Sequence, residues 1–426
     1  MKIIIVGGGG REHALLKALR KNPGIETIYA LPGNGGMVGE ALLVDIAATE
    51  VEAIRDFACQ KAVDLVVVGP EAPLTLGLVD LLTEAGILAF GPRKNAALVE
   101  GSKVFAKELM RKYGIPTAEY MVFADHGEAL NFVQNREELD YVIKADGLAA
   151  GKGVIIPQTR EEAVEAINAI MAERVFGASG NRVVIEELLT GPEVTMLTFC
   201  DGKTVVPMVS SMDHKRVGDG DEGPNTGGMG VIAPNPYYTE EIHRYCWEHI
   251  YRPTVQALEK EGRPFQGCLY FGLMLTPAGP KVIEYNCRFG DPEAQAVLPL
   301  LKTDLLQVLK ATIQGRLAKV PVDFSSAHAA CVMAASKGYP GDYETGWEIS
   351  MGELADAVVY HSGTASRNGK LYTAGGRVLG VTATAPDLEA AIGKAYRGMG
   401  KIHFPGMHYR RDIGQRALEK RKDGGA

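Results

Sequence analysis

The sequence predicts a multidomain protein that combines α/β and α+β units, and three observations carry this prediction. Residues 1–95 alternate apolar strand patterns with helical periodicity, which is typical of a parallel sheet. Farther along, a glycine-rich turn joins two strand patterns directly in "VIKADGLAAGKGVIIP", as in a hairpin. The chain has 426 residues, which at ~150 residues per domain corresponds to about three domains.

The composition is that of a globular protein able to bury extensive cores, with 46% apolar and 23% charged residues. The net charge of −7 argues against a nucleic-acid or acidic-membrane surface. No apolar run approaches the ~18 residues of a membrane span, and "MKIIIVGGGGREH" lacks the long apolar core of a signal peptide. The six cysteines include no CxxC pair, which is typical of buried thiols in a reducing compartment. We therefore expect a cytoplasmic protein without nucleic-acid or membrane partners.

The first unit should alternate strands and helices along its whole length. "KIIIVGG" predicts a buried strand, "EHALLKALRKN" a helix and "ETIYALPGN" a second strand. A helix over residues 51–62, the strand "DLVVVGPE" and the helix "LGLVDLLTEAG" follow. Ligands of such sheets bind at the carboxyl ends of the strands.

The middle of the chain mixes helices with hairpins. "KVFAKELMRKYG" and "REEAVEAINAIMAE" predict helices, and "NRVVIEELLTGPEVTMLTFCDG" predicts two strands joined by a turn. Residues 207–233 are polar and glycine-rich, and we expect a long loop without secondary structure that is functional or disordered. A helix over 239–261 and the strands "GCLYFGLML" and "PKVIEYNCRFGDPE" come next.

The last unit begins near residue 325. It should hold strands near 328–335 and 377–384 and a closing helix over 387–399.

The first candidate site is the glycine run "VGGGGREH", which ends a strand and opens a helix. A dinucleotide fingerprint would need a third glycine where Glu12 or His13 stands, and an acid at the end of the second strand, which is absent. Two interpretations stay open: a tight turn used for packing, or N–H groups that face a substrate phosphate. We favour the second, with Asn34 and Glu71 at the same edge of the sheet.

The second candidate site is the hairpin "VIKADGLAAGKGVIIP". It is not a P-loop, because only three residues separate Gly147 from Gly151 and no Ser or Thr follows Lys152. Lys144 ends the first strand, and glycines such as Gly153 let backbone N–H groups approach phosphate oxygens. The hairpin is therefore interpreted as a phosphate-binding element of a nucleotide site; the alternative is an exposed flexible hairpin.

An acidic strand end in "VVIEELLTGPEV" is the third candidate. An adenine amino group needs an acceptor, and ribose hydroxyls need a carboxylate. The residues that can supply them are Glu186, Glu187, Leu188 and Glu193. The alternative is an exposed acidic turn.

The fourth candidate is "KVIEYNCRFGDPE". Glu284 and Asn286 are two residues apart on a strand, so their side chains share a face. A carboxylate and a carboxamide oxygen are hard ligands that suit Mg²⁺ when substrate phosphates complete its shell. Arg288 follows on the same face as a fork donor for carboxylate or phosphate. The alternative is the polar outer face of an edge strand.

Lysine, glycine hairpin, acidic strand end and E-x-N strand, in this order, resemble the ATP-grasp fold. Longer motifs resemble the phosphoribosylamine–glycine ligases, also called glycinamide ribonucleotide synthetases, over nearly the whole chain. These motifs are "GGREHAL", "VGPEAPL", "EGSK", "IKADGLAAGKGV", "DHKRVGD", "GPNTGGMG", "EYNCRFGDPE" and "GYPGDY".

The resemblance implies an N-terminal parallel-sheet substrate domain (1–100), an ATP-grasp region (101–320) with a mobile lid at about 120–188, and a small mixed C-terminal domain (325–420). It implies a monomer that uses ATP and Mg²⁺ or Mn²⁺ to join glycine to 5-phosphoribosylamine in purine biosynthesis. Glycine's carboxylate would take the γ-phosphate to form glycyl phosphate, which the amine then attacks. Such phosphoryl transfer depends on alignment and charge neutralisation rather than on a covalent nucleophile.

The resemblance also implies roles for individual residues. Phosphates would be held by Lys103 and Lys144, with Gly151, Lys152 and Gly153 on the hairpin. Adenosine would be held by Glu186, Glu187, Leu188 and Glu193. The metal ligands would be Glu284 and Asn286, and the acyl-phosphate site would comprise Asp213, Lys215, Arg288 and Asp291. The other substrate would be bound by Gly9, Gly10, Arg11, Asn34 and Glu71.

One departure concerns the strand before "EYN", where many ATP-grasp enzymes have another acidic ligand. Here "GCLYFGLML" has none, so metal ligation would rest on two side chains and water. His214 stays open between a base and a structural histidine.

Three alternative functions are weighed against this reading. A nicotinamide-dependent oxidoreductase would leave "EYNCR" without a role. The intact lysines and the metal pair argue against a nucleotide-binding regulator without turnover. A carboxylate–amine ligase for a different amine is the runner-up.

Overall fold

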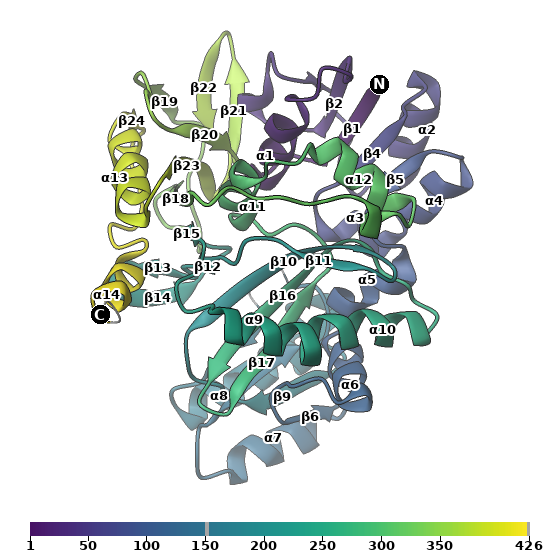
Figure 1. Ribbon diagram of the computed structural model, residues 1–426. Coiled ribbons are helices and arrows are strands. Elements are labelled where there is room, and N and C mark those ends of the chain that lie inside the picture. The colour runs from purple at the N-terminus through teal and green to yellow at the C-terminus, as the bar shows by residue number, and fades with distance from the viewer. Residues whose placement is uncertain (150–152, 424–426) are drawn as a thin grey trace.

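The computed structural model describes residues 1–149 and 153–423 (Figure 1). Gly151 and Lys152 of the predicted phosphate hairpin lie outside these residues. In the view of Figure 1 the N-terminal domain lies at the top, the predicted lid at the bottom and the C-terminal segment at the left.

The N-terminal domain is a five-stranded parallel sheet in the order β3-β2-β1-β4-β5. Its strands are β1 Lys2–Gly7, β2 Thr27–Pro32, β3 Leu42–Leu43, β4 Leu65–Val68 and β5 Leu88–Phe90, and its helices are α1 Gly10–Leu19, α2 Val51–Lys61, α3 Glu71–Leu76 and α4 Leu78–Glu84. Ile3, Ile4 and Ile5 are fully buried, because helices cover both faces of a parallel sheet. The predicted parallel sheet is confirmed, and the strand order reverses at β1, where ligands of such sheets bind.

The body is an antiparallel sheet in the order β11-β10-β16-β17. Its strands are β10 Glu193–Asp201, β11 Val205–Pro207, β16 Gln266–Thr276 and β17 Gly279–Asn286, and the helices near it are α5 Lys94–Gly101, α6 Lys103–Tyr113, α9 Glu240–Cys246, α10 Arg252–Lys260, α11 Glu293–Val297 and α12 Leu305–Ile313. A π-helical segment joins α9 to α10, so the helix predicted over 239–261 is confirmed as one continuous element. Tyr251 and Leu258 of this helix pack on Phe271 and Tyr285 of the sheet.

The predicted lid region is a small α+β unit with its own apolar core. Its sheet has the order β6-β9-β7-β8, formed by β6 Tyr120–Phe123, β7 Tyr141–Ala145, β8 Val154–Ile155 and β9 Val183–Glu187, with helices α7 His126–Asn135 and α8 Arg160–Ile167. Ile143, Ile167 and Ile185 belong to a core that is separate from those of the other domains.

The C-terminal domain contains the order β12-β15-β18-β23-β20 and a smaller sheet β21-β22-β19-β24. The strands are β12 Met212–Asp213, β15 Gly230–Ala233, β18 His328–Ala335, β19 Glu348–Met351, β20 Val358–His361, β21 Thr364–Arg367, β22 Lys370–Thr373, β23 Arg377–Ala385 and β24 Ile402–His403, and the helices are α13 Leu388–Met399 and α14 Gln415–Asp423. The two strands and the helix predicted for this unit are confirmed; β19 to β22, β24 and α14 were not predicted.

The prediction that residues 207–233 lack secondary structure is wrong. Besides β12 and β15, this segment forms β13 Arg216–Gly218 and β14 Glu222–Asn225. β15 pairs with β18, almost one hundred residues later in the chain by residue number, so no local pattern signals it. β13 and β14 carry glycine and charged residues instead of an apolar alternation, which hides them from strand periodicity.

Candidate active site

Two adjoining cavities lie where the N-terminal domain, the lid region, the body and the C-terminal domain meet. The first has a volume of about 410 Å³ and the second about 530 Å³. Both are lined by Lys144, Glu186, Asp213, Lys215 and Glu284. Residues predicted from four separate motifs are therefore brought together in one place.

The predicted metal pair lies on β17, on the wall of the first cavity. Glu284 stands opposite Gly272 of β16, and Asn286 stands opposite Tyr270. A Cβ atom at Gly272 would come within 2.9 Å of the Glu284 side chain, so the glycine leaves room for that carboxylate. Arg288 donates a hydrogen bond to Asn286 Oδ1 at 3.4 Å and lines the same cavity, as predicted.

The charges around Glu284 are complementary to it. Lys215 Nζ lies 3.9 Å from Glu284 Oε1. Although burial opposes the shift, Lys215, Lys144 and Lys103 lower the pKa of Glu284, which stays ionised. No group of three or more His, Cys, Asp or Glu side chains suited to a metal occurs within residues 1–149 and 153–423. Two adjacent oxygen donors fit Mg²⁺, which readily takes its other ligands from water and phosphate.

A buried carboxylate holds two lysines beside the cavities. Glu186 on β9 forms ion pairs with Lys144 on β7 and with Lys107 on α6, the latter at 2.5 Å. All three side chains are almost fully buried. The two lysines lower the pKa of Glu186 against the effect of burial, and burial lowers the pKa of Lys107 to about 8. The sequence reasoning missed Lys107; its signal was the four-residue spacing from Lys103, which places both on one face of α6.

Lys103 and the end of the lid strand β7 meet at the start of α6. Lys103 Nζ donates a hydrogen bond to the Gly147 carbonyl at 3.0 Å. Ser102 caps the helix by accepting from Phe105 N–H, and its hydroxyl donates to Asp146 Oδ1 at 2.9 Å. Burial lowers the pKa of Lys103. The N-terminus of α6, its lysine and the lid loop thus form one side of the first cavity.

Lys215 lies between the two cavities, with its ammonium 2.8 Å from Glu193 Oε2. Glu193 and Glu284 raise the pKa of Lys215 despite its burial, so the ammonium is held in its charged form. Burial, together with the charge of Glu293, raises the pKa of Asp213. Asp291 behaves differently, because Arg377 and Arg11 lower its pKa against burial.

Arg288 connects the body with the N-terminal domain. Its Nε donates to Glu71 Oε2 at 3.0 Å, and its Nη2 lies 3.2 Å from Glu100 Oε1. Arg11, on α1, reaches the same wall and donates to the Phe289 carbonyl at 3.1 Å. Glu100 was not predicted as a site residue; it accepts from Cys287 N–H at 2.6 Å and so fixes the chain between Asn286 and Arg288.

The Glu71–Arg288 pair should make stability depend on pH. Although burial opposes it, Arg288 and Arg11 lower the pKa of Glu71 from 4.5 to about 2. The unfolded chain therefore binds this proton first, so the stability from Glu71 is present above pH 4.5 and is lost as the pH falls toward 2. At about 1.4 kcal/mol per pKa unit, the contribution is on the order of 3 kcal/mol.

Urea unfolding of the wild type and of Glu71→Gln should show this effect. The difference in free energy of unfolding should be largest near neutral pH and should shrink between about pH 5 and about pH 3. A difference that stays constant over this range would show that the carboxylate charge does not stabilise the fold.

The glycine run at the start of α1 approaches the cavity from the N-terminal domain without lining it. A Cβ atom at Gly8 would come within 2.3 Å of the Gly33 carbonyl, and one at Gly10 within 2.3 Å of Gln295 Nε2. One at Gly9 would lie 3.0 Å from Asp291 Oδ2. Close packing alone therefore requires glycine at Gly8, where the obstacle is backbone, whereas the obstacles at Gly9 and Gly10 are side-chain ends.

Asn34 also lies away from both cavities. Its amide donates to the carbonyls of Gly8 and His361 at 2.9 and 2.8 Å, and its side-chain oxygen accepts from Gly36 N–H. His13 accepts from His361 N–H at 2.9 Å. These contacts fasten the N-terminal domain to β20 of the C-terminal domain, so the structure places Asn34 in an interface between domains.

The remaining predicted nucleotide residues line one cavity or the other. Glu187 and Leu188 line the second cavity, and Gly153 lines the first. The Glu187 carboxylate is exposed and lies 3.0 Å from Lys281.

His214 is engaged at both ring nitrogens. Nδ1 lies 3.1 Å from the Gly230 carbonyl, and Nε2 accepts from Gly414 N–H at 3.1 Å. Burial, with a smaller effect of Arg410, lowers the pKa of His214 to about 4, so the ring is neutral near pH 7. Of the two roles left open by the sequence, the structural one is favoured, because neither nitrogen is available to a substrate.

Arg377 is a cavity residue that the sequence reasoning missed. Its Nη1 donates to the carbonyls of Gly227, Gly228 and Asp291 at 2.6, 3.2 and 2.7 Å. It thereby joins the glycine turn after β14 to the turn before α11. Its own segment, "TAGGRV", gives no sign of these contacts, because its partners are at least 86 residues away.

This arrangement defines an ATP-grasp protein: lysines from a lid and a helix face an acidic strand across an antiparallel body. Family models match the N domain of phosphoribosylglycinamide synthetase over residues 1–100, its ATP-grasp (A) domain over 101–294 and its C domain over 329–416. The chain belongs to the phosphoribosylglycinamide synthetase family.

Relatives cover almost the whole chain. A phosphoribosylamine–glycine ligase of Caldanaerobacter subterraneus is 49% identical over 414 residues, which cover 97% of this chain and 99% of the relative. The human trifunctional purine biosynthetic protein adenosine-3 is 46% identical over 423 residues, 98% of this chain and 42% of that protein. The crystal structure of a Thermotoga maritima phosphoribosylamine–glycine ligase superposes with a TM-score of 0.84 at 36% identity, covering 97% of this chain and 100% of that one. A biotin carboxylase domain of Hydrogenobacter thermophilus, at 16% identity and a TM-score of 0.75, shares the fold alone.

Proposed function

We propose that this chain joins glycine to 5-phosphoribosylamine at the expense of ATP, through glycyl phosphate, and so makes glycinamide ribonucleotide in de novo purine biosynthesis. The observation that carries the proposal is the meeting of Lys103, Lys144 and Lys215 with the Glu284–Asn286 pair at one cavity. Relatives of 44% to 49% identity over nearly their whole length are phosphoribosylamine–glycine ligases by name.

In the first step an oxygen of glycine's carboxylate attacks the γ-phosphorus, and the bond from that phosphorus to the ADP oxygen breaks. Lys103 and Lys144 would hold the phosphate chain, and Lys215 and Arg288 would lie at the acyl-phosphate end. The Glu284–Asn286 pair would hold Mg²⁺ or Mn²⁺, which offsets phosphate charge when bound. The charged form of Lys215 is favoured by its carboxylate neighbours, so it can stabilise the transferring group.

In the second step the amine nitrogen of phosphoribosylamine attacks the carbonyl carbon of glycyl phosphate. The C–O bond to phosphate breaks, inorganic phosphate leaves and the nitrogen loses a proton. Asp213 and Asp291 border this end of the cavity. Arg11 and Glu71, with Gly9 and Gly10 behind them, would receive the phosphoribosyl part; Asn34 would hold the glycine loop in place.

The second cavity would receive adenosine, against Glu187, Leu188 and Glu193. Glu186 borders both cavities and would act on the nucleotide through the two lysines that it holds. Gly151, Lys152 and Gly153 would complete the phosphate site.

The test of the function is substrate-dependent ADP release, together with a chemical trap. ADP should accumulate rapidly only when glycine and phosphoribosylamine are supplied together. Glycine and ATP alone, with hydroxylamine as a nucleophile, should yield glycine hydroxamate. ADP release without any need for glycine would overturn the ligase proposal, and a faster reaction with another amine would support the alternative ligase.

We also propose that the protein is a cytoplasmic monomer divided into residues 1–100, 101–320 and 325–420. Within the described ranges, no helix is both long and apolar enough to cross a membrane. The six cysteines are free thiols, and five of them are buried, which suits a reducing compartment.

We propose in addition that residues 120–188 close over the nucleotide as a lid. Gly147 has a positive φ of 132°, and β8 spans only Val154–Ile155, so the second strand of the hairpin has only a short pairing with β7. Amide exchange over residues 141–155 should slow on addition of Mg²⁺ and a non-hydrolysable ATP analogue, while exchange over α2 stays unchanged. Equally slow exchange with and without nucleotide would mean that the hairpin is a fixed element.

A further inference from the structure

The hairpin of β13 and β14 lies between two cavity residues but belongs to no larger sheet among the described strands. Among the described strands, β13 and β14 pair only with each other. A two-stranded hairpin is at best marginally stable in water on its own. Lys215 precedes the hairpin and Thr226 follows it, and both line the cavities. Contacts from elsewhere must therefore fix its position.

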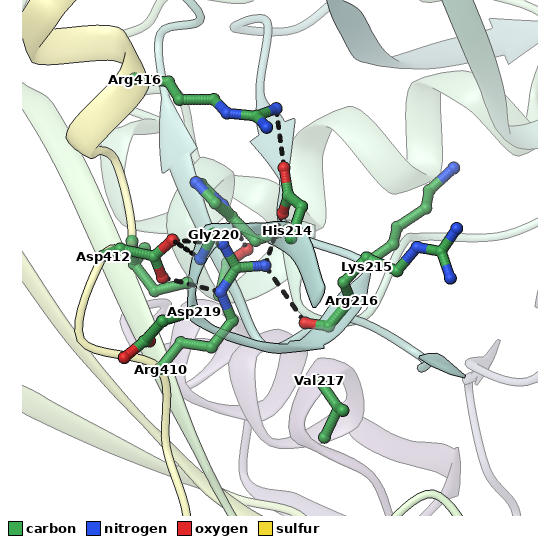
Figure 2. A network of polar contacts seen from close by, with 12 residues as sticks. His214, Lys215, Arg216, Val217, Asp219, Gly220, Arg410, Asp412 and Arg416 are labelled. Carbon is green, nitrogen blue, oxygen red and sulfur yellow. Dashed lines mark hydrogen bonds and ion pairs between the residues drawn. The ribbon is translucent and has the colours of Figure 1, made fainter. Parts of the chain in front are cut away.

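Those contacts come from residues 408–416, which lie after β24 and include the first two residues of α14, here called the C-terminal strap (Figure 2). The strap meets the hairpin region at successive points along the chain. The contacts are His408 Nε2 to the Val217 carbonyl (2.8 Å), Arg411 N–H to Asp219 (2.7 Å), Asp412 to Gly220 N–H (2.9 Å) and Gly414 N–H to His214 (3.1 Å).

Arg410 is the centre of this network. Its side chain is only 2% exposed. Two of its nitrogens donate to Asp412 at 2.8 and 2.7 Å. The third donates to Asp221 at 2.7 Å and to the Arg216 carbonyl at 3.1 Å, and Asp221 also pairs with Arg416. A planar guanidinium can donate hydrogen bonds in three directions at once, whereas a lysine ammonium cannot reproduce this geometry.

Both chain neighbours of Lys215 are held by the strap. His214 accepts from Gly414, and the Arg216 carbonyl accepts from Arg410. Figure 2 shows the Lys215 side chain pointing away from the Arg410 guanidinium. The strap therefore fixes the backbone of Lys215 and leaves its ammonium free for the cavity, where it meets Glu193.

We propose that Arg410 is a positioning residue for the ligase reaction: its guanidinium fixes the β13–β14 hairpin and thereby holds Lys215 at the acyl-phosphate end of the cavity. This inference rests on the proposed function for the role of Lys215. Arg410 lines neither cavity, so it acts through the hairpin alone.

The test compares Arg410→Met with the wild type and with Arg397→Met, the same change at an exposed arginine of α13. In Arg410→Met, amide exchange over residues 214–225 should quicken. The KM for glycine should rise about 10- to 100-fold, because a displaced Lys215 ammonium would no longer meet the carboxylate of bound glycine. The KM for ATP should rise less than the glycine KM, because Lys103 and Lys144 are untouched while Arg216 and Asp221 of the hairpin region line the second cavity. Arg410→Lys should resemble Arg410→Met, and Arg397→Met should resemble the wild type.

A merely structural role would lower thermal stability and the active fraction without moving the glycine KM. That result, or unchanged exchange over the hairpin, would overturn the proposal. Should Arg410→Met fail to fold, Asp412→Asn, which keeps the guanidinium and weakens one acceptor, is judged by the same two measurements. If the wild type shows no glycine-dependent turnover, the proposed function fails and the positioning role with it, while the exchange comparison still decides whether Arg410 holds the hairpin.

Discussion

Replacing Glu284 with Gln or Asn286 with Ala should lower turnover by at least about 100-fold while the protein stays folded. Glu284 and Asn286 are two residues apart on β17, line the same cavity and form a donor pair that fits Mg²⁺. Glu284 is 35% exposed on the cavity wall, so the fold does not depend on burying it. Steady-state ADP release at saturating Mg²⁺ measures the effect, and thermal unfolding checks the fold.

Glu259→Gln is the matched control, because this glutamate is exposed on α10 and its nearest ion-pair partner lies 3.9 Å away. The control should retain wild-type turnover. Wild-type turnover in Glu284→Gln or Asn286→Ala at saturating Mg²⁺ would remove the metal assignment.

Lys144→Met should weaken ATP binding by at least about tenfold and slow phosphoryl transfer. Lys144 lies near the C-terminal end of β7. Its ammonium contacts Glu186 and donates to the Ile283 carbonyl at 3.2 Å, beside Glu284. Removing one partner of a buried ion pair typically costs ~3–5 kcal/mol, so the free energy of unfolding should fall as well. Because Lys107 remains paired with Glu186, the decrease in the free energy of unfolding should be smaller than for an isolated pair.

The double variant Lys144→Met, Glu186→Gln separates the two effects. Glutamine removes the buried charge, and Lys107 keeps its hydrogen bond to Thr117 at 2.8 Å. Stability should recover in part, whereas affinity for a non-hydrolysable ATP analogue, measured by calorimetric titration, should stay low. Unchanged affinity and an unchanged single-turnover rate in Lys144→Met would exclude a phosphate role.

The parts of the fold that the sequence predicted are those with local periodicity. The strands β1, β2 and β4 and the helix over 239–261 show their periodicity in consecutive residues, whereas the short strands β3 and β5 were not predicted. The shared face of Glu284 and Asn286 could also be predicted, because residues two apart on a strand point to the same side of the sheet.

What could not be predicted depends on partners far away in the chain. Lys107 looks like an ordinary polar position of an amphipathic helix until Glu186 packs against it. Arg377 gains its role from carbonyls of Gly227 and Asp291. Asn34 is predicted as a substrate residue from its place at a strand end, and the hydrogen bond from its amide to the His361 carbonyl was not foreseen.

The hydrogen bonds between the N-terminal domain and β20 determine where this chain can be divided into fragments. Asn34 and His13 meet the backbone of His361 at 2.8 and 2.9 Å, so a fragment that stops before residue 325 would leave buried hydrogen-bonding groups exposed on its first domain. Any split version cut before β20 therefore separates Asn34 and His13 from His361, and should be stable only when both fragments are present together. A circular permutant keeps both sides of this contact in one chain.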